Sequence, residues 1–133
     1  MKLEAIDPLN LSAICAATVK KVLKMGYVMI RVDCYEEDPG SAGADWFCYH
    51  ITSPYIFPCG FAARHKLVLT PPHGYTKENF SWDDYLRKTT AKSVPPTLIK
   101  KVPYLTTAFL QVCSLAFVGT FIYTCCFVGE LKS

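Results

Sequence analysis

The residues of this chain best suited to chemistry are its cysteines and histidines. The seven cysteines are Cys15, Cys34, Cys48, Cys59, Cys113, Cys125 and Cys126. Their odd number and the absence of any Cys-x-x-Cys pair argue against a disulfide framework. The first five residues carry charges and no apolar stretch follows them, as it would in a secretory signal peptide. We therefore expect free thiols in a reducing compartment, with Cys15 and Cys48 as small buried residues.

A metal site is conceivable around Cys48, His50 and Cys59, because thiols and imidazole are the ligands that zinc prefers. The Cys-x-His spacing is, however, not one that zinc sites commonly use. We therefore predict no metal site and no cofactor.

No arrangement of catalytic residues is present. The chain lacks Gly-x-Ser-x-Gly, a P-loop and His-Glu-x-x-His, and its triad residues show no usual order. His50, His65 and His73 have no carboxylate or thiol partner at a suitable spacing, so we expect surface or satisfied polar residues. No run of basic residues exceeds two, which argues against a phosphate-binding stripe. We predict neither an enzyme nor a sequence-specific nucleic-acid binder.

The elements that must position these side chains are predominantly strands. A composition of 51% hydrophobic and 19% charged residues excludes a disordered tail. Segments rich in β-branched and aromatic residues predict strands over 14–22, 27–33, 46–50 and 66–69. Gly26 fits a tight hairpin between the first two, and Pro71 and Pro72 end the last. With no helix expected between them, these strands indicate a small β-barrel or meander.

Strand alternation also predicts the core. We expect burial of Ile14, Ala16, Val28, Ile30, Trp46 and Phe57. Val32 continues the face of Val28 and Ile30, so we expect it in the core as well.

A helix is predicted over 79–88. Ser81 is a candidate N-cap, with Asp84 three residues later as in a capping box. Trp82, Tyr85 and Leu86 share one helical face, which we expect to pack onto a neighbouring barrel. Residues 93–96, Ser-Val-Pro-Pro, predict an extended segment after it.

Several ordered blocks of the chain resemble a known family. They are residues 1–10 (MKLEAIDPLN), 45–48 (DWFC), 53–58 (SPYIFP), 69–75 (LTPPHGY) and 80–86 (FSWDDYL). In this order they resemble a malignant brain tumour (MBT) repeat, closest to the first repeat of the four-repeat members. The resemblance implies a mainly β fold: a small Tudor-like five-stranded MBT barrel with a short helical arm. It also implies a nuclear location and Polycomb-type chromatin repression through reading of mono- and dimethyl-lysine.

The resemblance assigns the methyl-lysine pocket to Asp7, Asn10, Val32 and Tyr35, with a third wall near Ala44. A methylated ammonium requires one carboxylate and aromatic faces. Val32 has no aromatic face, so the implied cage is degenerate and binding of histone tails should be weak or absent for this repeat. The alternative for Asp7 is a turn residue within Asp-Pro-Leu-Asn. We therefore expect a structural or interaction repeat whose partners are other MBT repeats or Polycomb-type repressor proteins.

The C-terminal part of the chain differs from the rest. Residues 104–129 carry no charge, and as a helix they would span about 39 Å, against about 30 Å for a hydrocarbon core. We expect a barrel core over 1–72, an arm and Pro-containing linker over 73–103, and one apolar C-terminal helix over 104–129. That helix is a candidate transmembrane segment. The alternative function is therefore a tail-anchored membrane protein that displays an MBT-like barrel.

Overall fold

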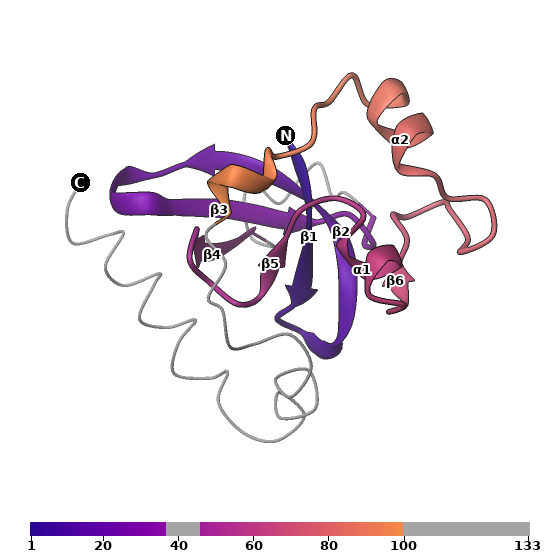
Figure 1. The fold of residues 1–133 in the computed structure, drawn as a ribbon, viewed down its shortest axis with the longest axis horizontal. Helices are drawn as coiled ribbons and strands as arrows, with labels where there is room; N and C mark the ends of the chain where they lie inside the picture. Colours follow the sequence, from indigo (N-terminus) through magenta and orange to yellow (C-terminus); the bar gives the residue numbers. More distant parts are fainter. Residues whose placement is uncertain (37–45, 100–133) are drawn as a thin grey trace.

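A computed structural model of the protein describes residues 1–36 and 46–99, which form a curled, mainly β domain (Figure 1). The strands are β1 (Lys2–Asp7), β2 (Asn10–Val22), β3 (Tyr27–Val32), β4 (Trp46–His50), β5 (Ile56–Phe57) and β6 (Leu69–Thr70). The helices are α1 (Phe61–Arg64), α2 (Trp82–Lys88) and two 3-10 turns, η1 (Lys24–Gly26) and η2 (Pro96–Leu98).

The described strands form one sheet in the order β4-β3-β2-β1-β5, and all neighbours along this path are antiparallel. A short β6 joins β2 in parallel, so the described sheet has six strands where five were expected. Strand β2, the longest of the described strands, forms with β3 the hairpin that extends from the sheet in Figure 1. The mainly β, barrel-like fold predicted from the residues is confirmed.

The turn between β2 and β3 uses backbone that favours glycine. Met25 and Gly26 have φ angles of 60° and 82°, both in the left-handed region. A Cβ atom on Gly26 would lie 2.8 Å from Nε2 of His50 on β4, so the His50 ring would have to shift to admit any other residue here. The predicted hairpin is thus confirmed, with a reason for its glycine that only the structure supplies.

Strand β1 is buried on both of its faces, because the main core covers one and the segment around α2 covers the other. Leu3 and Ala5 belong to the main core, whereas Lys2 and Glu4, on the alternate positions, contact the segment around α2. Val94 and Ile99, near the end of the described residues, also belong to this core. The predicted extended segment 93–96 is confirmed up to residue 95: Ser93 forms a bridge with Lys2 and Val94 N–H donates to the carbonyl of Lys2 at 2.8 Å, whereas Pro96 begins η2.

The predicted core is confirmed in its central strands and wrong at the edges. Ile14, Ala16, Val28 and Ile30 are buried, and Val32 is only 2% exposed. Trp46 and Phe57 are half-buried instead. Both lie on the terminal strands of the described sheet path, β4 and β5, where one side has no neighbouring strand to cover it. Cys15 is buried as expected, but Cys48, also on β4, is half-buried.

Two expectations for the segment after β5 are wrong. The strand predicted over 66–69 is displaced to β6, because Lys66 has a left-handed φ of 56° and Leu67 N–H donates to the carbonyl of Ala62. A short helix, α1, precedes it where no helix was expected. The backbone N–H groups of Gly60 and Ala62, at its start, donate to the buried carboxylate of Glu4 on β1, a partner far away in the sequence.

The predicted helix over 79–88 is shorter, beginning at Trp82. Ser81 is the N-cap residue, but its side chain makes no capping hydrogen bond. Asp84 pairs instead with Arg87 on the exposed side of the helix. The capping box is therefore wrong, although the start of the helix at Ser81 is correct.

The predicted apolar helix over 104–129 and the pocket wall near Ala44 lie outside the described residues. Within residues 1–36 and 46–99, no helix has the length and apolar character needed to cross a membrane.

Candidate functional site

The carboxylate of Asp7 lies at the end of β1 and is 1% exposed. Its Oδ1 accepts a hydrogen bond from the backbone N–H of Leu9 at 2.8 Å, as the turn interpretation predicts. Its Oδ2 accepts a hydrogen bond from the hydroxyl of Tyr35 at 2.6 Å. Both oxygens are therefore engaged within the chain.

A hydrogen bond from Arg31 to the backbone of Tyr35 helps to hold Tyr35 beside Asp7. The Nη2 atom of Arg31 donates to the carbonyl of Tyr35 at 3.0 Å, while the Tyr35 side chain remains 43% exposed. The hydrogen bond to the Asp7 carboxylate stabilises the neutral phenol and raises the pKa of Tyr35 to about 12. Tyr35 thus approaches Asp7 with its hydroxyl group.

The structure does not bring the other two predicted pocket residues to this carboxylate. The side chain of Asn10 is exposed, and its Oδ1 accepts a hydrogen bond from the Ser12 hydroxyl. The side chain of Val32 belongs to the main hydrophobic core. Of the four candidates, only Asp7 and Tyr35 interact through their side chains.

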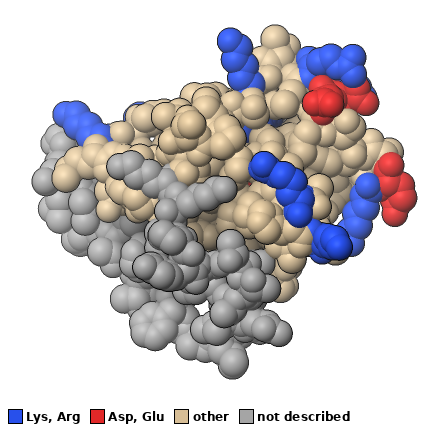
Figure 2. Space-filling view, viewed as in Figure 1, with Lys and Arg blue, Asp and Glu red and all other residues tan. Residues whose placement is uncertain are grey.

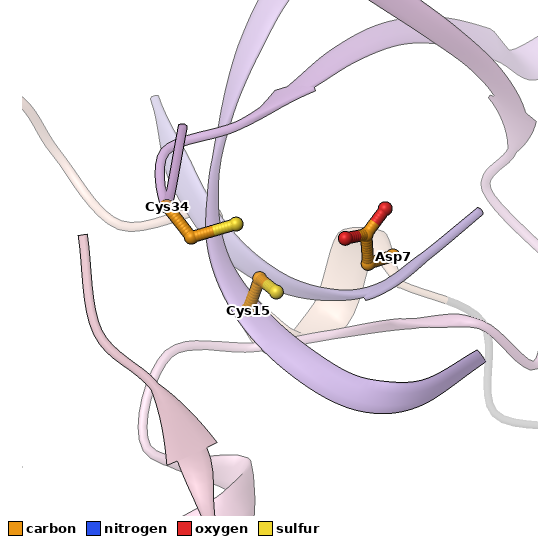
Figure 3. Close-up of side chains that lie close together, drawn as sticks. All are labelled: Asp7, Cys15 and Cys34. Carbon is orange, nitrogen blue, oxygen red and sulfur yellow. The ribbon is translucent and has the colours of Figure 1, made fainter. Parts of the chain in front are cut away.

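Two cysteines that sequence reasoning did not place here join Asp7 instead. Atoms of Asp7, Cys15 and Cys34 lie within 4.8 Å of one another, and Figure 3 shows their side chains around a shared space. The β2–β3 pairing explains this, because Ala17 lies opposite Val32 and each further residue moves one step along both strands. That rule carries Cys15 opposite Cys34. A register counted regularly from the turn would have missed this pairing, because the register shifts by one residue between Val19 and Lys21. Burial raises the pKa of both thiols.

A second aromatic residue, Tyr49, links two strands next to Asp7. The hydroxyl of Tyr49 on β4 donates to the carbonyl of Ile6 at 2.9 Å, and its ring packs against the main core. Burial raises the pKa of Tyr49 above its usual range. Tyr49 therefore ties β4 to β1 beside Asp7.

A buried polar network joins α2 to the barrel. Nζ of Lys2 donates to Oδ2 of Asp33 at 2.8 Å and to Oγ1 of Thr18 at 2.6 Å, and it lies 4.7 Å from the centre of the Tyr85 ring. The hydroxyl of Tyr85 also donates to Oδ2 of Asp33 at 2.9 Å. Burial, followed by the charge of Asp33, raises the pKa of Tyr85. The Lys2–Asp33 ion pair is thus fully hydrogen-bonded, as burial of charge requires.

Glu4 makes the second connection. Its carboxylate is fully buried and accepts hydrogen bonds from Gly60 N–H at 2.7 Å, Ala62 N–H at 2.8 Å and Trp82 Nε1 at 2.9 Å. One carboxylate therefore satisfies the start of α1 and fixes α2. The expectation that Trp82 and Tyr85 pack onto a neighbouring barrel is wrong in this structure, since both bind β1 or its neighbours in their own barrel.

The surface offers no continuous basic stripe on the face shown in Figure 2, where Lys and Arg stand in separate groups and Asp and Glu lie among them. This distribution agrees with the balanced charges of the sequence.

The residues Cys48, His50 and Cys59 do not form a metal-binding cluster. Among the described residues, the three ligating groups that lie together are those of Asp7, Cys15 and Cys34.

Comparison with known proteins identifies the family of this curled sheet. A protein-family model described as "mbt repeat" matches residues 1–76. This chain belongs to the MBT repeat family. The resemblance read from the sequence blocks is thereby confirmed.

Curated relatives and a solved structure agree. MBT domain-containing protein 1 of Xenopus laevis is 59% identical over 101 residues, which cover 76% of this chain and 16% of that relative. Polycomb protein Sfmbt of Drosophila melanogaster is 53% identical over 102 residues, 77% of this chain and 8% of that relative. The crystal structure of the four MBT repeats of Drosophila melanogaster Sfmbt, in complex with the peptide RHR(me)KVLR, has a TM-score of 0.71 and 50% identity. It covers 80% of this chain and 24% of that chain.

These relatives place the MBT repeat in a family of chromatin readers. The chain spans less than a fifth of the length of the curated relatives described above.

Proposed function

We propose that this chain is a nuclear, chromatin-associated MBT-repeat protein that acts in transcriptional repression. Within it, this repeat serves as a structural or interaction repeat with a degenerate methyl-lysine pocket. Its partners would be other MBT repeats or Polycomb-type repressor proteins, and it would act by binding, without catalysis. The name of the Polycomb relative and the methylated peptide in the Sfmbt structure support the chromatin setting.

The observation that carries the degenerate pocket is the bonding of Asp7. A methylated ammonium needs a carboxylate oxygen for its N–H and aromatic faces for its methyl groups. Here both Asp7 oxygens are already bonded, and Tyr35 offers its hydroxyl to one of them. Val32, the position that the resemblance assigns to an aromatic wall, is a core aliphatic residue.

The energetics support weak binding. One carboxylate and one ring contribute roughly 1–2 kcal/mol, and the ammonium must also share the Asp7 carboxylate with the Tyr35 hydroxyl. Such a sum does not offset the loss of translational and rotational freedom, so the dissociation constant would be about millimolar or weaker.

The test is a titration of mono- and dimethyl-lysine peptides into the full chain, with the unmethylated peptide as a control. We expect no saturable binding below about 1 mM by calorimetry or by chemical-shift changes. Asp7→Asn is the matched variant, because it keeps the shape of the side chain and removes its charge. A micromolar dissociation constant that disappears in Asp7→Asn would restore the reader function and overturn the proposal.

A further inference from the structure

Asp7 belongs to the degenerate pocket, but the two thiols beside it, Cys15 and Cys34, have no role in the function proposed above. The three ligating atoms lie within 4.8 Å of one another and come from β1, β2 and the residue pair that follows β3. Figure 3 shows both thiols and the carboxylate around one space. We propose that these three side chains bind one Zn²⁺ ion.

The donor set fits this metal. Two thiolates and one carboxylate are ligands that Zn²⁺ accepts, with Zn–S distances of about 2.3 Å and Zn–O distances of about 2.0–2.2 Å. In a tetrahedron with those bonds the ligand atoms lie roughly 3.5–3.8 Å apart. Separations of up to 4.8 Å therefore need a contraction of at most about 1.3 Å, which the ligands would reach by side-chain rotation.

The surroundings orient the ligands. Leu9 N–H and the Tyr35 hydroxyl each hold one oxygen of Asp7, which is how outer groups commonly fix metal-binding carboxylates. Cys15 is fixed within β2, whereas Cys34 is partly exposed and provides an entry path. Three protein ligands leave the fourth position of the tetrahedron to water.

The charges balance without any further reactant. On binding, each thiol releases its proton to solvent, and Asp7 contributes a carboxylate. Two thiolates and one carboxylate around a divalent cation leave a single negative charge at the site. The bound ion would occupy the carboxylate that a methylated ammonium needs, so the two ligands would exclude each other.

The experiment uses the full chain, reduced and stripped of metal, with Co²⁺ as the probe and Zn²⁺ as the competitor. We expect one Co²⁺ per chain, with the intense visible bands of a tetrahedral thiolate site that disappear when Zn²⁺ is added. Cys34→Ser should weaken binding by at least about 100-fold, because loss of even an outer-shell group costs about 10–100-fold. Asp7→Asn should weaken it as well.

Two control variants separate this site from four of the other five cysteines. Cys48→Ser, on β4, and the triple variant Cys113→Ser, Cys125→Ser, Cys126→Ser should bind Co²⁺ like the unmodified chain. Absence of tetrahedral bands in the unmodified chain would overturn the proposal, whatever the folding of the variants. So would binding that survives in a folded Cys34→Ser chain or is lost in the triple variant. Peptide titrations run with a chelator keep this outcome separate from that of the proposed function.

Discussion

Replacement of Glu4 by glutamine tests whether the buried carboxylate holds the helical segments onto the barrel. Glu4 is fully buried and accepts three N–H hydrogen bonds, from Gly60, Ala62 and Trp82. Hydrogen bonds to a charged group contribute about 1.5–3 kcal/mol each, against about 1 kcal/mol for neutral partners. Glutamine keeps one oxygen for two of these donors and turns its NH₂ group toward the third.

The expected cost follows from these bonds. Two bonds lose their charge and one is lost outright, leaving two N–H groups facing each other. The lower desolvation cost of a neutral amide offsets part of this loss. We therefore expect Glu4→Gln to lower the free energy of unfolding by about 3 kcal/mol.

Urea denaturation of the full chain, followed by tryptophan fluorescence, measures this change. Glu36→Gln, at an exposed position, is the control and should leave the unfolding free energy unchanged. Trp82→Phe removes a single donor, so it should cost about 1–2 kcal/mol and combine with Glu4→Gln less than additively. A loss below about 1 kcal/mol for Glu4→Gln, or full additivity with Trp82→Phe, would refute the assignment of this carboxylate as the shared anchor.

Two further predictions concern the pocket and the hairpin. NMR titration of the Tyr35 ring should give a pKa near 12, returning toward 10 in Asp7→Asn; an unchanged value in that variant would contradict the bond as its cause. Because folding raises this pKa, the contribution of Tyr35 to stability is complete below about pH 10 and is lost as the pH rises toward 12. Gly26→Ala should destabilise the fold by about 1–2 kcal/mol for its positive φ and more for the contact with His50. Gly74→Ala has nearly the same φ and open space around it, so thermal melts showing equal losses would rule out that contact as a cause.

Local sequence patterns were sufficient for three strands of this repeat. The β-branched and aromatic runs that became β2, β3 and β4 carry their own preference for extended backbone, and the glycine between the first two marks the turn. Alternation along these strands predicted that Ile30 and Val32 are buried, because side chains of one strand face are covered together. Ordered blocks of residues then identified the family.

Tertiary structure decided the elements whose partners lie far away in the sequence. The short helix α1 begins where Glu4, more than fifty residues earlier, accepts its N–H groups, and no pattern within residues 61–64 contains that information. Trp82 and Tyr85 were correctly predicted to share a helical face, but their hydrogen bonds to Glu4 and Asp33 determine that this face packs on its own barrel. The pocket shows the same division. The sequence supplied Asp7 and Tyr35 separately, and the curl of the sheet joined them and placed two thiols beside them.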